Sequence, residues 1–301
     1  MKIAILGAGG VGGYFGGALA RAGHQVSMLA RGAHLDALRE RGLEVRTPEE
    51  TFTVTVGAVD DPRDLGANDL AIVAVKTYSL GDIAPAVRIV AEAGAIVLPL
   101  LNGVDAADRL IEDGVPAERV LGGLTEISAV RSGPGVIERR STFQRVIAGE
   151  RAGGLSERAE RIAAAFREAG AEARASEDID ADLWRKLTFI ASIAAACGLA
   201  RSPIGAVRKA PLGWLMIQRA VHEVITVAQA RGVALTAEDE EKILSFAESL
   251  ADPLKPSLLV DLEAGRPTEI ADLSGAVSRL GRLAGVETPV HDVATAALGV
   301  G

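Results

Sequence analysis

The feature that most constrains this fold is a glycine-rich turn that follows an apolar segment at the start of the chain. Residues 3–6 are apolar, and Gly7, Gly9 and Gly12 follow them in G-x-G-x-x-G spacing. In a strand–turn–helix unit the first glycine allows a tight turn, the second lets a phosphate approach the backbone, and the third lets the helix pack against the sheet. The sequence therefore predicts a buried strand, a phosphate-binding turn and a helix.

The residues around the turn decide how specific this pattern is, because glycine-rich turns without a ligand are common. Residues 14–22 have helical character and end at Gly23, and residues 24–30 form a second apolar segment. A helix between two such strands is the unit that binds dinucleotides, with the pyrophosphate at the unpaired N–H groups of the helix. We expect a dinucleotide to be bound by Gly7, Ala8, Gly9, Gly10, Val11 and Gly12.

The residue after the second strand indicates which dinucleotide is bound. An acidic residue there binds the ribose 2′-hydroxyl of NAD, whereas this chain has Arg31. An arginine can pair with the 2′-phosphate of NADP. The alternative is a solvated surface arginine, but the missing carboxylate and the cation together favour NADP (NADPH) as the cofactor.

Two further apolar segments end in polar residues. Residues 68–76 are read as a strand that ends at Lys76, and residues 95–101 as a strand followed by Asn102. Because open α/β sheets bind ligands at the carboxyl ends of their strands, we expect both side chains to line the cofactor site. The alternatives are a solvated lysine and a ligand-free Asn-Gly turn.

The pattern of elements changes near residue 177. Before this point strands and helices alternate, and after it long helices dominate. Further strands are expected within residues 43–59, 120–128, 135–138, 144–148 and 171–176, with helices over 34–41, 83–92 and 155–169. The later helices are expected over 182–196, 211–231, 237–251 and 270–284. We predict an α/β fold class, with an N-terminal Rossmann-type dinucleotide-binding domain over 1–177 and an all-α C-terminal domain over 178–301.

Composition excludes several functional classes. The 301 residues carry a formal net charge of −8 and 3% aromatic residues, which argues against a nucleic-acid partner. We expect no apolar run to be long enough to cross a membrane, and therefore no membrane partner. The four histidines are scattered, and we expect no metal site. Cys197 is the single cysteine, which excludes an intrachain disulfide and favours the cytoplasm.

Two charged residues of the helical domain are candidates for chemistry. Lys186 lies in Leu-Trp-Arg-Lys-Leu, at the beginning of an otherwise apolar helix. A lysine at this position lies either at the solvent-exposed end of the helix or desolvated in an active site. Glu269 follows Pro267 in a segment read as the first turn of a helix, where a carboxylate also complements the helix dipole.

These motifs, in this order, resemble the ketopantoate reductase (2-dehydropantoate 2-reductase) family almost from end to end. The resemblance rests on the glycine turn, Arg31-Gly32, Val75-Lys76, Leu101-Asn102-Gly103, Leu183-Trp-Arg-Lys186-Leu187 and Thr268-Glu269-Ile270 with Asp272. It implies an NADPH-dependent reduction of a 2-oxo acid to a 2-hydroxy acid, as in pantothenate biosynthesis, and it favours a homodimer.

The resemblance also implies roles for individual residues. Lys186 would be the general acid, and Glu269 would lie near the nicotinamide ribose and the substrate hydroxyl. Lys76 and Asn102 would line the cofactor, and Ser257 would contact the substrate carboxylate. A lysine at a closing cleft can protonate an alkoxide and attract a substrate anion.

The chain departs from the family on the substrate side. Ketopantoate reductases usually carry asparagines four and eight residues after the lysine, with a third beyond the helix. This chain has Ile190, Ala194 and apparently Ile204 there. Apolar side chains cannot bond the polar groups of ketopantoate, so we expect a less polar carbonyl acid as the substrate. Cys197 lies on roughly the same face, where we expect a buried core role.

Two other functions fit the same residues. One is an opine- or imine-type dehydrogenase, which would require an amine co-substrate. The other is a non-catalytic NADP-binding sensor, which is compatible with the missing asparagines. Retention of Lys186 and Glu269 argues against the sensor, because it needs neither.

Overall fold

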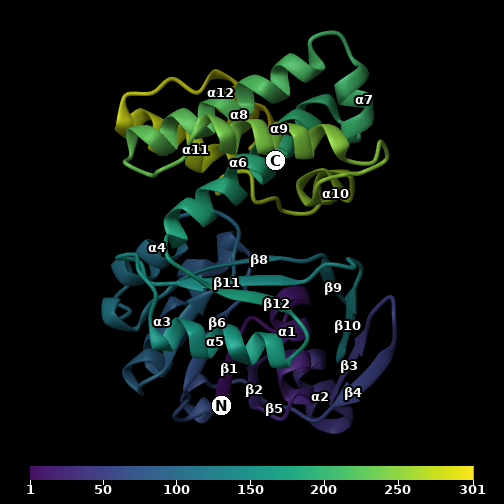
Figure 1. Ribbon diagram of the computed structural model, residues 1–301. Coiled ribbons are helices and arrows are strands. Elements are labelled where there is room, and N and C mark those ends of the chain that lie inside the picture. Colours follow the sequence, from purple (N-terminus) through teal and green to yellow (C-terminus); the bar gives the residue numbers. More distant parts are fainter. Residues whose placement is uncertain (301) are drawn as a thin grey trace. The chain divides into compact units, whose positions relative to one another are not determined.

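The computed structural model describes residues 1–300, and their contacts divide the chain into two compact units. The first contains residues 1–101 and 105–179, and the second contains residues 102–104 and the chain from Asp180 onward (Figure 1). This division falls two residues after the boundary drawn at residue 177. The segment 102–104 belongs with the helices because Val104 packs against their apolar core.

The first unit is built on a five-stranded parallel sheet with the strand order β5-β2-β1-β6-β7. The strands are β1 (Lys2–Leu6), β2 (Gln25–Leu29), β5 (Gly57–Val59), β6 (Leu70–Val73) and β7 (Ile96–Pro99). The helices that follow these strands are α1 (Gly10–Arg21), α2 (Gly32–Arg41), α3 (Leu80–Glu92) and α4 (Ala106–Glu112). The strand order reverses beside β1, which is where such sheets bind ligands.

Both faces of this sheet are covered, which explains why its central strands are continuous apolar runs. Along β1, Ile3 and Ile5 belong to one core cluster, whereas Ala4 and Leu6 belong to another. This alternation follows from the two-residue period of a strand. The first cluster includes Phe15 of α1, which packs edge-on against Phe166 with 5.3 Å between the two ring centroids.

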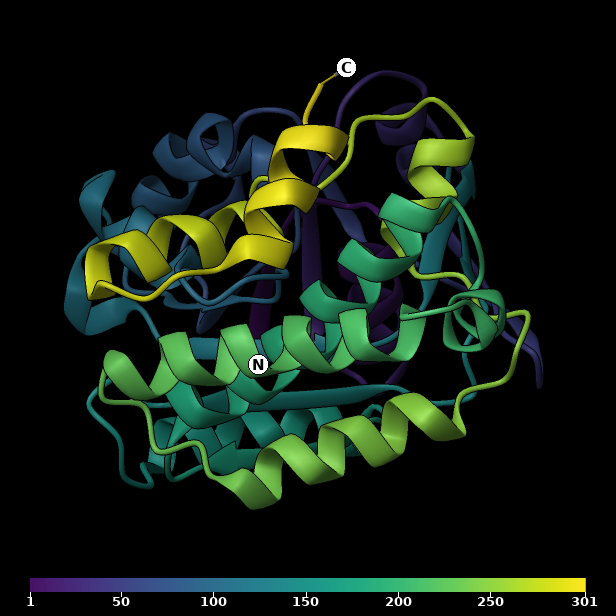
Figure 2. The same cartoon turned by 90° about the horizontal axis from the view of Figure 1, so that it is seen from above.

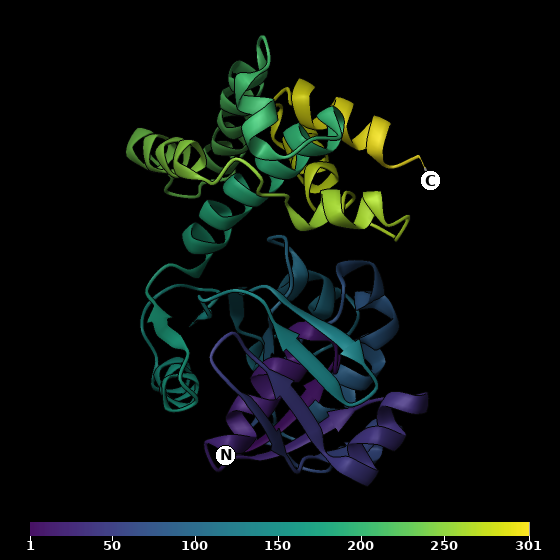
Figure 3. The ribbon, with the colours of Figure 1, turned by 90° about the vertical axis from the view of Figure 1, so that its right-hand side faces the viewer.

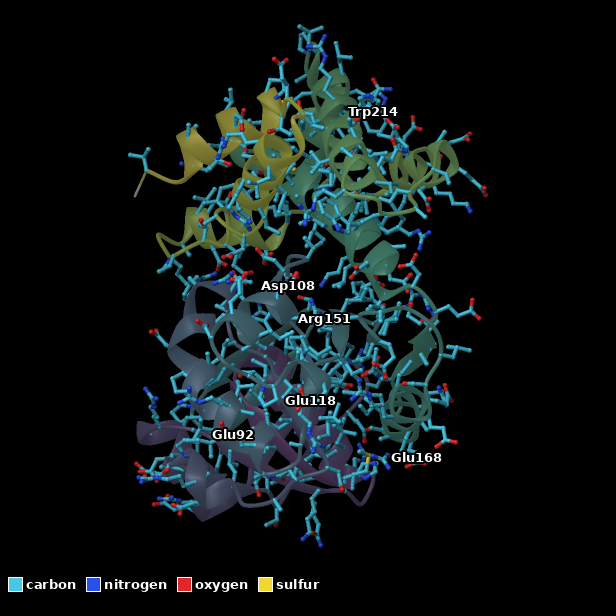
Figure 4. All side chains as sticks on the ribbon, turned by 90° about the vertical axis from the view of Figure 1, so that its left-hand side faces the viewer. Glu92, Asp108, Glu118, Arg151, Glu168 and Trp214 are labelled. Carbon is cyan, nitrogen blue, oxygen red and sulfur yellow. The ribbon has the colours of Figure 1, made fainter. Side chains whose placement is uncertain are left out.

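Two smaller sheets complete the first unit. One has the order β4-β3-β10-β9 and the other β12-β11-β8. Their strands are β3 (Leu43–Arg46), β4 (Thr51–Val54), β8 (Gly122–Glu126), β9 (Ala129–Gly133), β10 (Val136–Arg139), β11 (Arg145–Gly149) and β12 (Glu172–Ser176), and α5 (Glu157–Glu168) joins the last two. Short 3-10 turns are η1 (Pro62–Leu65), η2 (Thr77–Ser79) and η3 (Ala117–Arg119). Arg151, after β11, contacts Asp108 of α4 (Figure 4).

The second unit is helical from α6 to α12, as can be followed in Figures 2 and 3. Its helices are α6 (Ile179–Ala200), α7 (Ile204–Lys209), α8 (Gly213–Ala230), α9 (Ala237–Ser249), α10 (Ser257–Glu263), α11 (Ser274–Ala284) and α12 (Pro289–Leu298). The short helices α7 and α10 and the terminal α12 were not predicted. The helix expected from residue 270 begins at Ser274, so Glu269 and Asp272 precede it, and the reading of Pro267 as a helix start was wrong.

The longest helix corrects one expectation about membranes. Within the described residues, α6 is the one helix that is long and apolar enough to cross a membrane by length and composition. The expectation that no segment reaches this length was therefore wrong. However, 67% of its apolar window is buried inside the structure, which is typical of a core helix.

A buried polar network joins three helices of the second unit. The Glu223 carboxylate of α8 accepts the N–H groups of Val290 (2.9 Å) and His291 (3.1 Å) at the start of α12. The His291 ring is fully buried between the Ser274 hydroxyl (3.1 Å) and the Ala220 carbonyl (3.0 Å). Burial lowers the pKa of His291 to about 4, so the ring is neutral near neutral pH.

Candidate functional site

The glycine turn has the geometry that a phosphate-binding turn requires. Gly7 has a φ of +108°, and a Cβ there would lie 2.8 Å from the Ala74 carbonyl group. A Cβ on Gly12 would lie 2.1 Å from the Gly7 carbonyl oxygen, so α1 could not approach the strand with any larger residue. Only glycine fits at these two positions.

Gly9 differs from its neighbours because it faces open space. A Cβ built on Gly9 meets nothing within 4 Å, whereas one on Gly10 would lie 2.1 Å from the Ala129 carbonyl oxygen of β9. Gly9 is also the N-cap of α1, next to its unpaired N–H groups. The turn is therefore accessible at the one position where the motif requires a pyrophosphate, and these residues fit a dinucleotide.

Three of the predicted cofactor-binding segments follow adjacent strands at one edge of the sheet. Leu6, at the end of β1, is in register with Leu29 of β2 and with Val73 of β6. The glycine turn begins at the next residue after β1, Arg31 lies two residues after β2, and Lys76 lies three residues after β6. Lys76 is exposed and lies three residues beyond β6, in front of η2, so the reading of the strand as ending on the lysine was wrong.

Arg31 is placed to meet an anion. It is the N-cap of α2, whose first turn contains no acidic residue. Its side chain is exposed and makes no hydrogen bond or ion pair with any of residues 1–300. At the other end of the same helix, Arg39 pairs with Asp60 at 3.3 Å. A guanidinium without an acidic partner, at a helix N-terminus, is suited to a phosphate.

The second unit brings together two predicted site residues, Asn102 and Glu269. The Asn102 Nδ2 donates a hydrogen bond of 3.2 Å to Oε2 of Glu269. Glu269 is only 7% exposed, and its carbonyl oxygen accepts the N–H groups of Asp272 and Leu273 at the turn before α11. The carboxylate is therefore held in place by its own backbone and by the Asn102 amide.

Lys186 lies in the second turn of α6, between the buried Trp184 and Leu187, and is itself partly exposed. The preceding residue, Arg185, forms an ion pair of 2.7 Å with Asp239 of α9. This ion pair links α6 to α9.

The predicted substrate residues differ in accessibility. Ile190, one turn after Lys186, is partly exposed, and Ser257 is exposed as the first residue of α10. Ala194 is 2% exposed and Ile204 is fully buried, and both belong to the helical core. The nearby Cys197 is also buried, and burial raises the pKa of its thiol to about 12.

Some neighbours of the glycine turn had no signal in the sequence. The β9 strand, whose Ala129 meets Gly10, was missed because none of its residues is buried and it therefore forms no apolar run. His34 of α2 is buried and bonds the tip of the turn after β9, which only the fold reveals. Residues 1–300 contain no group of three or more His, Cys, Asp or Glu side chains that could hold a metal ion.

Comparisons with known proteins cover both units. Residues 3–153 match the family model described as ketopantoate reductase PanE/ApbA, and residues 178–300 match its C-terminal model. The chain is 35% identical to 2-dehydropantoate 2-reductase of Halobacterium salinarum, over 96% of this chain and 95% of that protein. It is 30% identical to the uncharacterized oxidoreductase YkpB of Bacillus subtilis, over 99% and 98% of the two chains.

Solved structures show the same fold. A PanE/ApbA family ketopantoate reductase from Ralstonia eutropha is similar with a TM-score of 0.90 and 29% identity, over 100% of this chain and 98% of that one. D-mandelate dehydrogenase, solved with NADH and anilino(oxo)acetate, is similar with a TM-score of 0.88 and 26% identity, over 99% and 97%. The Rossmann-like first unit and helical second unit are thus confirmed, and the chain belongs to the ketopantoate reductase family of oxidoreductases.

Proposed function

We propose that this protein reduces a 2-oxo acid to a 2-hydroxy acid with NADPH. The observation that carries the proposal is the hydrogen bond between Asn102 and Glu269, in the same unit as Lys186. It joins two of the residues that the family resemblance assigns to the cofactor and the reacting centre. A protein that only sensed NADP would have no use for Lys186 and this pair.

The cofactor is held by residues of the first unit. The open backbone at Gly9 receives the pyrophosphate at the N-terminus of α1. Arg31 binds the 2′-phosphate, and its lack of an acidic partner among the described residues supports this choice over NADH. Lys76 lines the cofactor, which supplies a hydride when it is bound.

The proton comes from Lys186. As the carbonyl carbon of the substrate accepts the hydride, negative charge develops on its oxygen, and the Lys186 ammonium donates a proton from Nζ to that oxygen. The same positive charge attracts the substrate carboxylate before reaction. Glu269, fixed by Asn102, orients the nicotinamide ribose and the new hydroxyl.

We propose that the substrate carries an apolar group in place of the hydroxylated arm of ketopantoate. Ile190 presents partly exposed apolar surface one turn from Lys186. The similar D-mandelate dehydrogenase was solved with anilino(oxo)acetate, whose anilino group is bulky and apolar, and this supports the choice. Ser257 bonds the carboxylate of the substrate.

A reductase panel tests the proposal. Purified protein is assayed with 2-oxo acids graded by size and polarity, each with NADPH and with NADH. We expect NADPH to be preferred and an apolar 2-oxo acid to exceed ketopantoate in kcat/KM. Turnover that requires an added amine would instead support an opine- or imine-type dehydrogenase, and NADPH binding without turnover of any acid would support the sensor.

We further propose that the enzyme works in the cytoplasm as a homodimer. The buried Cys197, whose thiol pKa is raised, agrees with a protein that needs no disulfide. Light scattering coupled to size exclusion measures the mass of the assembly, and a mass of one chain would contradict the dimer.

A further inference from the structure

His34 occupies an unusual position beside the cofactor turn. It lies in the first turn of α2, three residues after Arg31, and is only 5% exposed. Its Nδ1 accepts the backbone N–H of Gly135 at 2.9 Å. Gly135 lies between β9 and β10 with a φ of +74°, and a Cβ there would lie 3.0 Å from Ala37 of α2. The ring therefore joins α2 to the tip of the β9–β10 hairpin.

The Gly135 bond determines where the ring carries its proton. Because Nδ1 accepts a hydrogen bond, the neutral ring is protonated on Nε2. Burial and then the positive charge of Arg131 lower the pKa of His34, although weak hydrogen bonding of the ring to the Ala8 backbone opposes this shift, so the ring is neutral near neutral pH. Nε2 is buried, and no acceptor among the described residues lies in full hydrogen-bond geometry with it. A buried donor without an acceptor is costly, so such a group calls for an explanation.

We propose that His34 is a positioning residue for the cofactor, whose Nε2–H bonds the Ala8 carbonyl in the dinucleotide-bound protein. Ala8 lies between Gly7 and Gly9, the residues that shape the pyrophosphate site. Through this bond the glycine turn is fastened to α2, which carries Arg31, and to the β9–β10 hairpin. The inference rests on the proposed function to the extent that the chain must bind a nicotinamide dinucleotide.

Such a bond would contribute to cofactor affinity. In the free protein the Nε2–H has only a poorly aligned acceptor, and the bound protein gains a well-formed hydrogen bond in a buried setting, where it is worth most. The bond acts on the turn and not on the 2′-phosphate. It should therefore strengthen binding of NADPH and NADH by the same factor.

Two amide variants separate the two ring nitrogens. In His34→Asn the side-chain oxygen can take the place of Nδ1 and keep the Gly135 bond, but nothing reaches Ala8. In His34→Gln the NH₂ group can take the place of Nε2, but the Gly135 N–H loses its acceptor. We expect His34→Asn to weaken binding of both dinucleotides about tenfold at an unchanged melting temperature. We expect His34→Gln to bind within about threefold of wild type and to melt at a lower temperature.

His24→Asn is the matched control. His24 also has a buried Nε2 without a hydrogen bond to any described residue, although the Glu168 carboxylate lies 3.7 Å from it, and it precedes β2 at the end of the sheet away from the turn. The His24→Asn variant should bind NADPH and NADH with the same affinities as the wild type. Dissociation constants are measured by titration of nicotinamide fluorescence, which does not depend on turnover.

Three results would overturn the inference. These are a folded His34→Asn variant with wild-type affinity, a His34→Gln variant as weak as His34→Asn, or an equal loss in His24→Asn. Failure of wild type to bind either dinucleotide would instead contradict the proposed function. If the His34 variants do not fold, ¹⁵N spectra of the histidine rings in the wild-type protein test the inference instead. The inference requires an Nε2–H tautomer whose proton signal shifts on addition of NADPH, and an unshifted signal contradicts it.

Discussion

The Asn102 amide donates a hydrogen bond of 3.2 Å to the Glu269 carboxylate, although 167 positions separate the two residues in the chain. We expect Glu269→Ala to lower kcat/KM about a hundredfold and Asn102→Ala about tenfold, because the first loses the carboxylate and the second only its support. The double variant should be little worse than Glu269→Ala alone, since both changes remove the same bond. Steady-state kinetics of the four proteins measure this coupling.

The exposed pair of His222 and Glu240 serves as the control for this cycle. Its contact distance is also 3.2 Å, but the His222 side chain is 68% exposed. Alanine variants of this pair should leave kcat/KM unchanged. Strictly multiplicative effects of Asn102→Ala and Glu269→Ala would contradict a shared role.

Lys186 is expected to limit the chemical step. Lys186→Ala should lower kcat at least about a hundredfold, because no proton donor then faces the developing alkoxide. Lys186→Arg keeps the positive charge but gives up a proton far less readily, so KM should change less than kcat. Lys209→Ala removes an exposed lysine that pairs with Asp252, and it should be neutral for turnover. Undiminished turnover of Lys186→Ala would refute the assigned role.

Arg31 is expected to select the cofactor. Arg31→Ala should raise KM for NADPH roughly tenfold or more and leave KM for NADH nearly unchanged, because only NADPH carries the 2′-phosphate. The melting temperature should not change, since Arg31 is exposed and makes no ion pair within residues 1–300. Arg39→Ala, in the same helix but paired with Asp60, is the control. An equal loss for both cofactors would argue against a phosphate contact.

The N-terminal sheet could be predicted because its physical cause is local. The β6 and β7 strands are buried on both faces, so they are read directly as apolar runs, and the glycine spacing identifies the turn after β1. The β9 strand lacks such a signal because none of its five residues is buried, and α7 lacks one because it has only six residues. The predicted start of α11 was too early because Pro267 is typical of a helix start, whereas the chain makes a turn before Ser274.

The sequence suggested candidate site residues, but it gave no indication of the contacts between them. Motif order suggested Asn102 and Glu269 separately, yet nothing local indicates that the two side chains meet. The apolar residues that follow Lys186 on α6 show the same limit. Helical spacing placed Ala194 on the face of Lys186 together with Ile190, but packing buries Ala194 in the core. His34 was missed because its partner Gly135 lies 101 positions away.

His291 is expected to make stability fall in mild acid. Burial holds the pKa of His291 at about 4, below the usual 6.5. Below pH 6.5 the imidazole therefore binds a proton in the unfolded chain but stays neutral in the folded chain. The contribution of neutral His291 to the free energy of unfolding is complete above pH 6.5. It falls by about 3 kcal/mol as the pH is lowered to about 4. Urea unfolding at several pH values should show a smaller decline for His291→Gln than for wild type. His222→Gln, at an exposed histidine, should follow wild type, and an equal decline for His291→Gln would contradict this origin.

Ile190 and Ala194 test whether the helical face after Lys186 selects the substrate. Ile190→Asn puts an amide on a partly exposed position one turn from the lysine, so we expect kcat/KM for ketopantoate to rise about tenfold relative to an apolar 2-oxo acid. Ala194→Asn puts the same amide into a site that is 2% exposed, and we expect it to destabilise the fold by about 1–3 kcal/mol without a gain for ketopantoate. A panel assay and thermal melts compare the two variants. An unchanged preference in a folded Ile190→Asn variant would show that the substrate is chosen elsewhere.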